Sequence, residues 1–130
     1  MPSPPLVRRA APWLLWFAVL GGATAWTVHL LVAWGLEEIA CASGSRSSDV
    51  LGVPLAVAIA AATLLPLAVS VAALVVAWRL WRRTRAAADG EVRVARASFM
   101  AVVGLWADAL FTLGILYGAV ALLFIRPCAT

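Results

Sequence analysis

The chain is too apolar to be a soluble globular domain. Its 130 residues are 65% hydrophobic and only 12% charged, and its mean hydropathy is +1.00. A soluble fold of this length has no interior large enough for so many apolar side chains, whereas a bilayer solvates them. The ten basic residues are all Arg and give a net charge of +4, which beside membrane spans indicates contact with anionic lipid headgroups rather than nucleic acid. We therefore expect an all-α membrane domain over residues 1–130.

The first transmembrane helix is predicted over about 12–36. Residues 1–11 carry several prolines and no periodicity, which is typical of a short cytoplasmic tail. Arg8 and Arg9, the apolar run and the triplet Ala23–Ala25 also resemble a secretory signal with its cleavage site. The apolar run continues to Leu36, however, which is long enough to span a bilayer and favours an uncleaved helix.

A second transmembrane helix is predicted over about 52–88. Glu37 and Glu38 begin the polar exterior loop that separates it from the first helix. Pro66 falls near the middle of the second helix, where it removes one backbone hydrogen bond and predicts a kink. We expect a neighbouring helix or Thr63 to satisfy the freed backbone group.

An Arg-rich hairpin over about 79–97 precedes the third helix, which is predicted over about 98–125. Each charge at the centre of a bilayer costs roughly 3 kcal/mol on insertion scales, so these guanidinium groups must lie in water. With Arg8 and Arg9 they outweigh Arg46 and Arg126 on the opposite side. The positive-inside tendency therefore predicts three membrane spans, with the N-terminus in the cytoplasm and the C-terminus outside. The arginines of the hairpin are Arg79, Arg82, Arg83, Arg85, Arg93 and Arg96.

Asp108 is the most informative residue inside the membrane. A carboxyl group at this depth is costly and by default marks a packing or functional site. Thr112 lies one turn along on the same helix face, and Ser70 is expected at a comparable depth. Three interpretations stay open for Asp108: a contact between helices, coupling to an ion or proton, and exposure in a water-filled crevice.

His29 is the only histidine. Counting from membrane centres near Thr24 and Thr112 places His29 and Tyr117 at similar depth, roughly 7 Å outward at 1.5 Å per residue. An imidazole–phenol hydrogen bond between the helices would satisfy both groups in lipid. A structural histidine and a functional one, at a cofactor edge, a proton path or a partner contact, remain alternatives.

Cys41 and Cys128 are predicted to lie on the outer face, each just beyond a helix end. Two cysteines of a small domain on an oxidising side are expected to form a disulfide. Independent free thiols and a metal or redox role are the alternatives.

Small residues recur at the four-residue spacing of close helix contacts. Ala18 and Gly22, Gly21 and Ala25, and Gly114 and Gly118 form such pairs. They serve either ordinary packing within the chain or a groove for a partner. The sequence contains no phosphate-binding loop, nucleophile–base set or HExxH motif, so we expect a protein that is not an enzyme and holds no metal or cofactor.

Two segments resemble small membrane proteins encoded beside bacterial haem–copper cytochrome c oxidase genes. The resemblance covers the first and third helices, and the motifs that carry it are short. It implies an accessory or assembly role at a respiratory oxidase, and Asp108 is not part of the pattern. The matching features are Trp26-x-x-His29-Leu30-Leu31, Glu38 and Cys41, and the stretch from Phe99 to Pro127-Cys128.

Two functions follow as expectations. The first is a non-enzymatic accessory or assembly subunit, in contact with membrane lipids and a larger membrane complex such as cytochrome c oxidase. The second is a small self-associating transporter or channel in which Asp108 is the coupling carboxylate. A haem or copper chaperone with His29 as a ligand is a third possibility.

Overall fold

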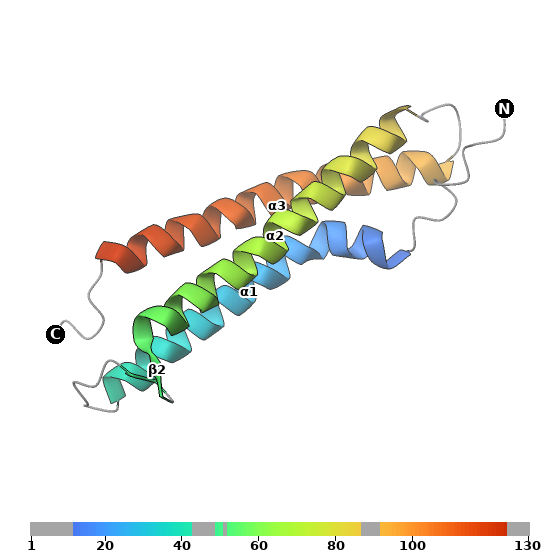
Figure 1. Cartoon of the computed structure of the whole chain (residues 1–130). Helices are drawn as coiled ribbons and strands as arrows, with labels where there is room; N and C mark the ends of the chain where they lie inside the picture. Colours follow the sequence, from blue (N-terminus) through green and yellow to red (C-terminus); the bar gives the residue numbers. More distant parts are fainter. Residues whose placement is uncertain (1–11, 43–48, 51, 87–91, 125–130) are drawn as a thin grey trace.

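Three long helices make up nearly all of the described chain (Figure 1). The computed structural model describes residues 12–42, 49–50, 52–86 and 92–124. The helices are α1 (Pro12–Ala42), α2 (Leu55–Ala86) and α3 (Val92–Phe124), and each of them contacts the other two. Each is long and apolar enough to cross a membrane. The prediction of an all-α bundle of three transmembrane helices is confirmed, and the chain is a multi-pass membrane protein.

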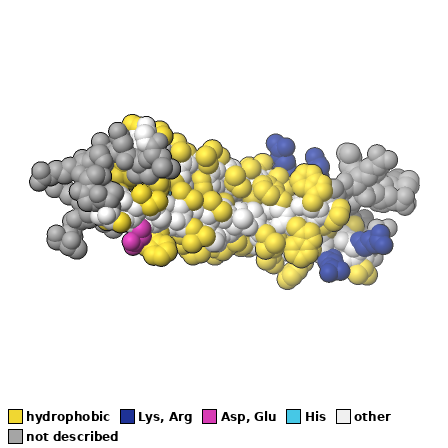
Figure 2. Space-filling model, turned by 90° about the horizontal axis from the view of Figure 1, so that it is seen from below, with side chains coloured by type: hydrophobic (Ala, Val, Ile, Leu, Met, Phe, Trp, Pro, Cys, Tyr) yellow, Lys and Arg dark blue, Asp and Glu magenta, His cyan; other side chains and the backbone are white. Residues whose placement is uncertain are grey.

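Neighbouring helices in the sequence run in opposite directions, so α1 and α3 are parallel to each other and α2 is antiparallel to both. The start of α1, the end of α2 and the start of α3 meet at one end of the bundle (Figure 1). Figure 2 shows arginine side chains near one end of an apolar body and acidic side chains toward the other. We call the first of these the Arg end, because α2 and α3 there carry Arg79, Arg82, Arg83, Arg85, Arg93 and Arg96.

α1 and α3 extend beyond their predicted bounds, whereas α2 lies within the predicted range of 52–88. α1 continues past 36 to Ala42, so Glu37 and Glu38 lie in its last turns and do not begin a loop. α3 begins at Val92 and not at 98, so the predicted 79–97 hairpin is largely helical on both sides. A helix satisfies its own backbone hydrogen bonds in water as well as in lipid, and the burial of Val94 supports the extra turn of α3.

A small β-hairpin precedes α2, where the sequence predicted an exterior loop followed by the first turn of the second helix. β1 (Asp49–Val50) pairs antiparallel with β2 (Val53–Pro54), and Val50 stands opposite Val53. Gly52 has a φ of 79°, in the left-handed region that glycine adopts without steric cost. Because Pro54 belongs to this hairpin, α2 begins at Leu55 and not near 52.

The bundle has small side chains inside and large apolar side chains outside. The fully buried apolar residues include Ala18, Ala73, Ala77 and Ala101, whereas Leu123 is 82% exposed. In water this distribution would be unfavourable, but in lipid the large side chains are solvated and small residues let the helix backbones approach. Exposed tryptophans flank the apolar span of α1, with Trp16 near the Arg end and Trp34 near the other. They are 18 residues apart in the sequence, roughly 27 Å along a helix and close to the thickness of the hydrocarbon core.

Candidate functional site

Asp108 joins α3 to α1 in the middle of the bundle. Its side chain is completely buried, and its Oδ1 accepts a hydrogen bond of 2.9 Å from the backbone amide of Gly22. This amide lies inside α1 and has the carbonyl of Ala18 as its expected helical acceptor, so helix geometry already orients the donor. Asp108 therefore faces its own bundle, as expected for a contact between helices and not for a group exposed in a water-filled crevice.

Two glycines make the space for this contact. A Cβ on Gly22 would lie 2.5 Å from Oδ1 and 2.9 Å from the Cα of Asp108. One turn toward the Arg end, a Cβ on Gly104 would overlap the carbonyl oxygen of Ala18. We call these four residues, Ala18 and Gly22 of α1 with Gly104 and Asp108 of α3, the α1–α3 crossing. The pair Ala18 and Gly22 was predicted from the sequence, but Gly104 was not. The signal for Gly104 was its four-residue spacing from Asp108, which puts both residues on one helix face.

The second carboxyl oxygen of Asp108 is buried without a hydrogen-bond partner among the described residues. A buried polar atom left without a partner costs roughly 1–3 kcal/mol of desolvation. Native proteins hold few such atoms, and each one calls for a structural or functional explanation. This oxygen is the observation that favours a coupling role for Asp108.

His29 links α1 to α2 at the position where Pro66 interrupts the helical hydrogen bonds. Its Nδ1 lies 3.0 Å from the carbonyl oxygen of Ala62, and the side chain is 2% exposed. In a regular helix that carbonyl accepts from the amide four residues later, which here is Pro66 and has no N–H. Because a carbonyl oxygen only accepts, Nδ1 carries the proton and donates it. Of the two predicted sources of a replacement bond, a neighbouring helix and Thr63, the structure shows the neighbouring helix, through His29.

Ser70 and Thr112 link α2 to α3. Their hydroxyl oxygens are 2.7 Å apart, and Ser70 is completely buried. Ser70 thus lies close in depth to Asp108, as expected, but bonds to the residue one turn further along α3. With the bonds of Asp108 and His29, each pair of helices is joined by a polar contact within the membrane span.

Tyr117 does not bond to His29. Tyr117 is 79% exposed, whereas the adjacent Gly118 faces inward, with its Cβ position 3.2 Å from Nε2 of His29. The predicted depth was right and the predicted direction around the helix was wrong, because successive residues of a helix point about 100° apart. Gly114 also faces α1, with its Cβ position 3.1 Å from the indole nitrogen of Trp26. The Gly114–Gly118 pair therefore serves packing within the chain.

The acidic and cysteine side chains of α1 lie near its C-terminal end, away from the arginines. Cys41 is in the last turn of α1, and Cys128 lies outside the described residues, so their pairing stays a prediction. Glu37 is half-buried and Glu38 exposed. Within the described ranges, no three His, Cys, Asp or Glu side chains gather closely enough to hold a metal ion.

Comparison with protein-family models, curated proteins and solved structures found no match to the chain. The function is therefore inferred from the contacts of the polar residues in the spans. Asp108, His29, Ser70 and Thr112 are each engaged by another helix of the same chain. Such an arrangement fixes the rotation and depth of the helices, and it leaves the large apolar side chains facing outward.

Proposed function

We propose that this chain is a non-enzymatic accessory or assembly subunit of a larger membrane complex in a bacterial cytoplasmic membrane. The supporting observation is that the buried polar side chains of the spans bond to the chain's own helices. The surface that the described spans present to their surroundings is mainly apolar. A surface of this kind suits packing against transmembrane helices of another protein.

The outward stripe of α3 is the contact surface in this proposal. Its large side chains are between 61% and 81% exposed and recur at intervals of three, four or seven residues. This is the spacing at which one helix presents side chains to a partner helix crossing at a small angle. The stripe consists of Phe99, Trp106, Leu110, Leu113, Tyr117 and Phe124.

The resemblance of α1 and α3 to proteins encoded beside cytochrome c oxidase genes makes a respiratory oxidase the proposed partner. Affinity purification from native membranes in a mild detergent, followed by mass spectrometry and an optical spectrum, tests this. We expect oxidase subunits and a haem spectrum to accompany the wild-type chain. The double variant Trp106→Ala, Tyr117→Ala should lose them, whereas Trp34→Ala, which removes a similarly exposed tryptophan from α1, should retain them.

A colourless, self-associated protein without a stoichiometric partner would contradict the accessory-subunit proposal. It would favour the second candidate, a small homo-oligomeric transporter or channel, which the unpartnered Oδ2 of Asp108 supports. Three helices do not enclose a pore, so this alternative requires several copies of the chain.

Asp108→Asn separates the two functions. The amide keeps an oxygen that accepts from Gly22 but cannot take up and release a proton at neutral pH. We expect the variant to fold and to purify with its partner as the wild type does. Loss of a transport or resistance phenotype in a correctly folded Asp108→Asn protein would instead establish coupling.

We also propose a disulfide between Cys41 and Cys128, which rests on the orientation of the Arg end toward the cytoplasm. Alkylation of fresh membranes followed by a non-reducing gel tests it. A bridged chain resists alkylation until it is reduced, whereas two cysteines that react before reduction would disprove the bridge.

A further inference from the structure

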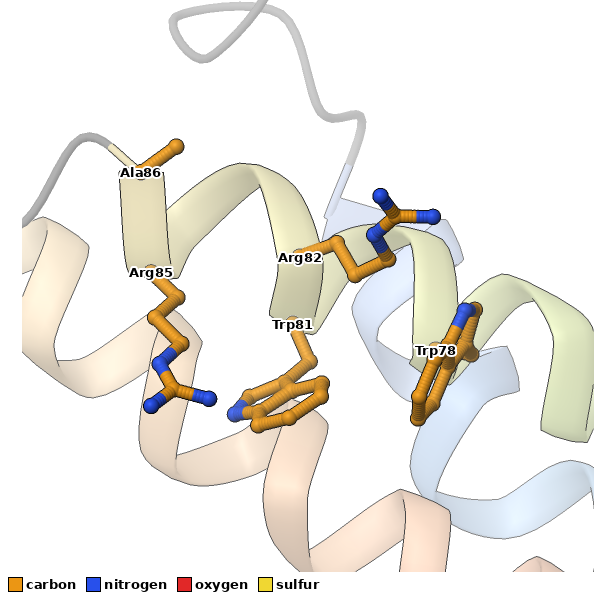
Figure 3. A pocket seen from close by; sticks show the side chains of 5 residues that line it. All are labelled: Trp78, Trp81, Arg82, Arg85 and Ala86. Carbon is orange, nitrogen blue, oxygen red and sulfur yellow. The ribbon is translucent and has the colours of Figure 1, made fainter.

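A groove at the Arg end of α2 combines aromatic and cationic side chains (Figure 3). It has a volume of about 300 Å³ and is lined by Trp78, Trp81, Arg82, Arg85 and Ala86. These positions follow one another at helical spacings of three, one, three and one residues, so a single face of α2 forms the lining. The volume is near the lower limit of small-molecule pockets, which suits a polar headgroup and not a whole lipid.

The aromatic rings hold one of the two cations in place. The guanidinium carbon of Arg85 lies 5.2 Å from the ring centroid of Trp81, within the range of a cation–π contact. Trp81 in turn lies against Trp78, with 5.2 Å between ring centroids. The guanidinium group has five N–H donors, and a cation–π contact with a ring leaves N–H groups available for an anion. Less side-chain freedom is therefore lost when Arg85 binds a ligand than when an unsupported arginine does.

The sequence of α2 indicates that the groove lies at the depth of lipid headgroups. The apolar part of α2 ends at Ala77, which is buried, and Trp78 and Arg79 follow it directly. Tryptophan is enriched at this boundary between hydrocarbon and water, where its ring contacts the upper acyl region. Arg82 and Arg85 are one and two turns further out, where a lipid phosphate would be found.

We propose that this groove binds the headgroup phosphate of one anionic glycerophospholipid from the leaflet at the Arg end. Arg82 and Arg85 would donate hydrogen bonds to the phosphate oxygens, and Trp78 would contact the glycerol and upper acyl region. This differs from the diffuse attraction between juxtamembrane arginines and a charged surface, which depends on the number of charges and not on their position. The proposed site consists of Arg82 and Arg85 together with Trp78 and Trp81. Arg93 and Arg96 of α3 do not line it.

Native mass spectrometry of the full chain in detergent tests the proposal, with phosphatidylglycerol or phosphatidylcholine as the added lipid. We expect the wild-type chain to retain one phosphatidylglycerol and to bind phosphatidylcholine much more weakly. The double variant Arg82→Gln, Arg85→Gln should bind phosphatidylglycerol at least about tenfold more weakly, which corresponds to about 1.4 kcal/mol. The control is the double variant Arg93→Gln, Arg96→Gln, which removes the same charge from exposed positions at the Arg end. This control should bind phosphatidylglycerol as the wild type does.

Three results would overturn the proposal. Equal weakening in both double variants would show attraction by net charge alone. Equal binding of phosphatidylcholine would show that the anionic headgroup is not recognised. Complete displacement of the lipid by millimolar inorganic phosphate would assign the groove to a small free anion. Trp81→Leu provides a further readout, because it keeps both arginines but removes the aromatic ring that contacts Arg85. It should weaken binding while the helix content stays unchanged.

Discussion

At the scale of single residues, Gly22 decides whether α1 and α3 can meet. Its missing side chain is the volume that the carboxyl group of Asp108 fills, and its amide is the donor that this group binds. Gly22 therefore both leaves space for the carboxyl group and donates a hydrogen bond to it at the α1–α3 crossing. A glycine elsewhere in α1 has neither role, because nothing lies within 4 Å of the Cβ position of Gly35.

We predict that Gly22→Ala destabilises the bundle by about 1–3 kcal/mol, the usual cost of forcing an extra methyl group into a packed interior. Gly35→Ala makes the same chemical change in the same helix but in open space. Since alanine favours a helix by up to about 1 kcal/mol over glycine, that variant should be neutral or slightly stabilised. Steric trapping in bicelles measures both free energies of unfolding, and equal effects at the two positions would contradict the role of Gly22.

At the scale of helices, α1 and α2 are joined through a defect in one of them. Pro66 frees the carbonyl of Ala62, and His29 from the neighbouring helix satisfies it. The proline and the histidine are therefore one structural unit, although they are on different helices. The burial of both residues is consistent with this pairing.

A double-mutant cycle tests that unit. His29→Leu should cost about 1–3 kcal/mol in the wild-type background, because it leaves a buried carbonyl without a donor. In a Pro66→Ala background the amide of residue 66 can bond to Ala62, so the same substitution should cost less. We expect a coupling energy of at least about 0.5 kcal/mol between the two changes, measured from free energies of unfolding. Additive effects would mean that His29 does not compensate for the proline.

The sequence predicted the helices and their depths well but not their rotations. Apolar length and flanking arginines identify the spans, and counting residues from the membrane centres brought His29 to the level of Gly118. The rotation of each helix about its axis is harder to predict from the sequence. Large apolar residues face lipid and small apolar residues face inward, so the two sides of a helix differ little in polarity. For this reason Tyr117 was expected inside and lies outside. The two-residue strands of the β-hairpin are too short to leave any periodic pattern in the sequence.

At the scale of the whole molecule, the charges of the described helices are separated along the bundle. Arginines gather at one end, and Glu37 and Glu38 lie toward the other. This asymmetry supports a single orientation in the membrane, since cytoplasmic segments carry an excess of arginine.

We predict that the Arg end is cytoplasmic. A phosphatase reporter that is active only outside the cytoplasmic membrane should be active when fused after Thr130 and inactive when inserted between α2 and α3. A fluorescent protein that matures only in the cytoplasm should give the opposite pattern at the same two positions. Activity of the phosphatase between α2 and α3 would reverse the proposed orientation.

The α1–α3 crossing also has a consequence for biogenesis. The hydrogen bond between Gly22 and Asp108 spans 86 positions of the chain, so the ribosome completes α1 and α2 long before the carboxyl group of α3 exists. Because α1 and α2 are already linked through His29 and Ala62, they can associate while α3 is still being translated. The side of this pair that carries Gly22 must remain open to lipid until α3 arrives. We therefore expect α3 to be the last helix to dock, when Asp108 binds the amide of Gly22.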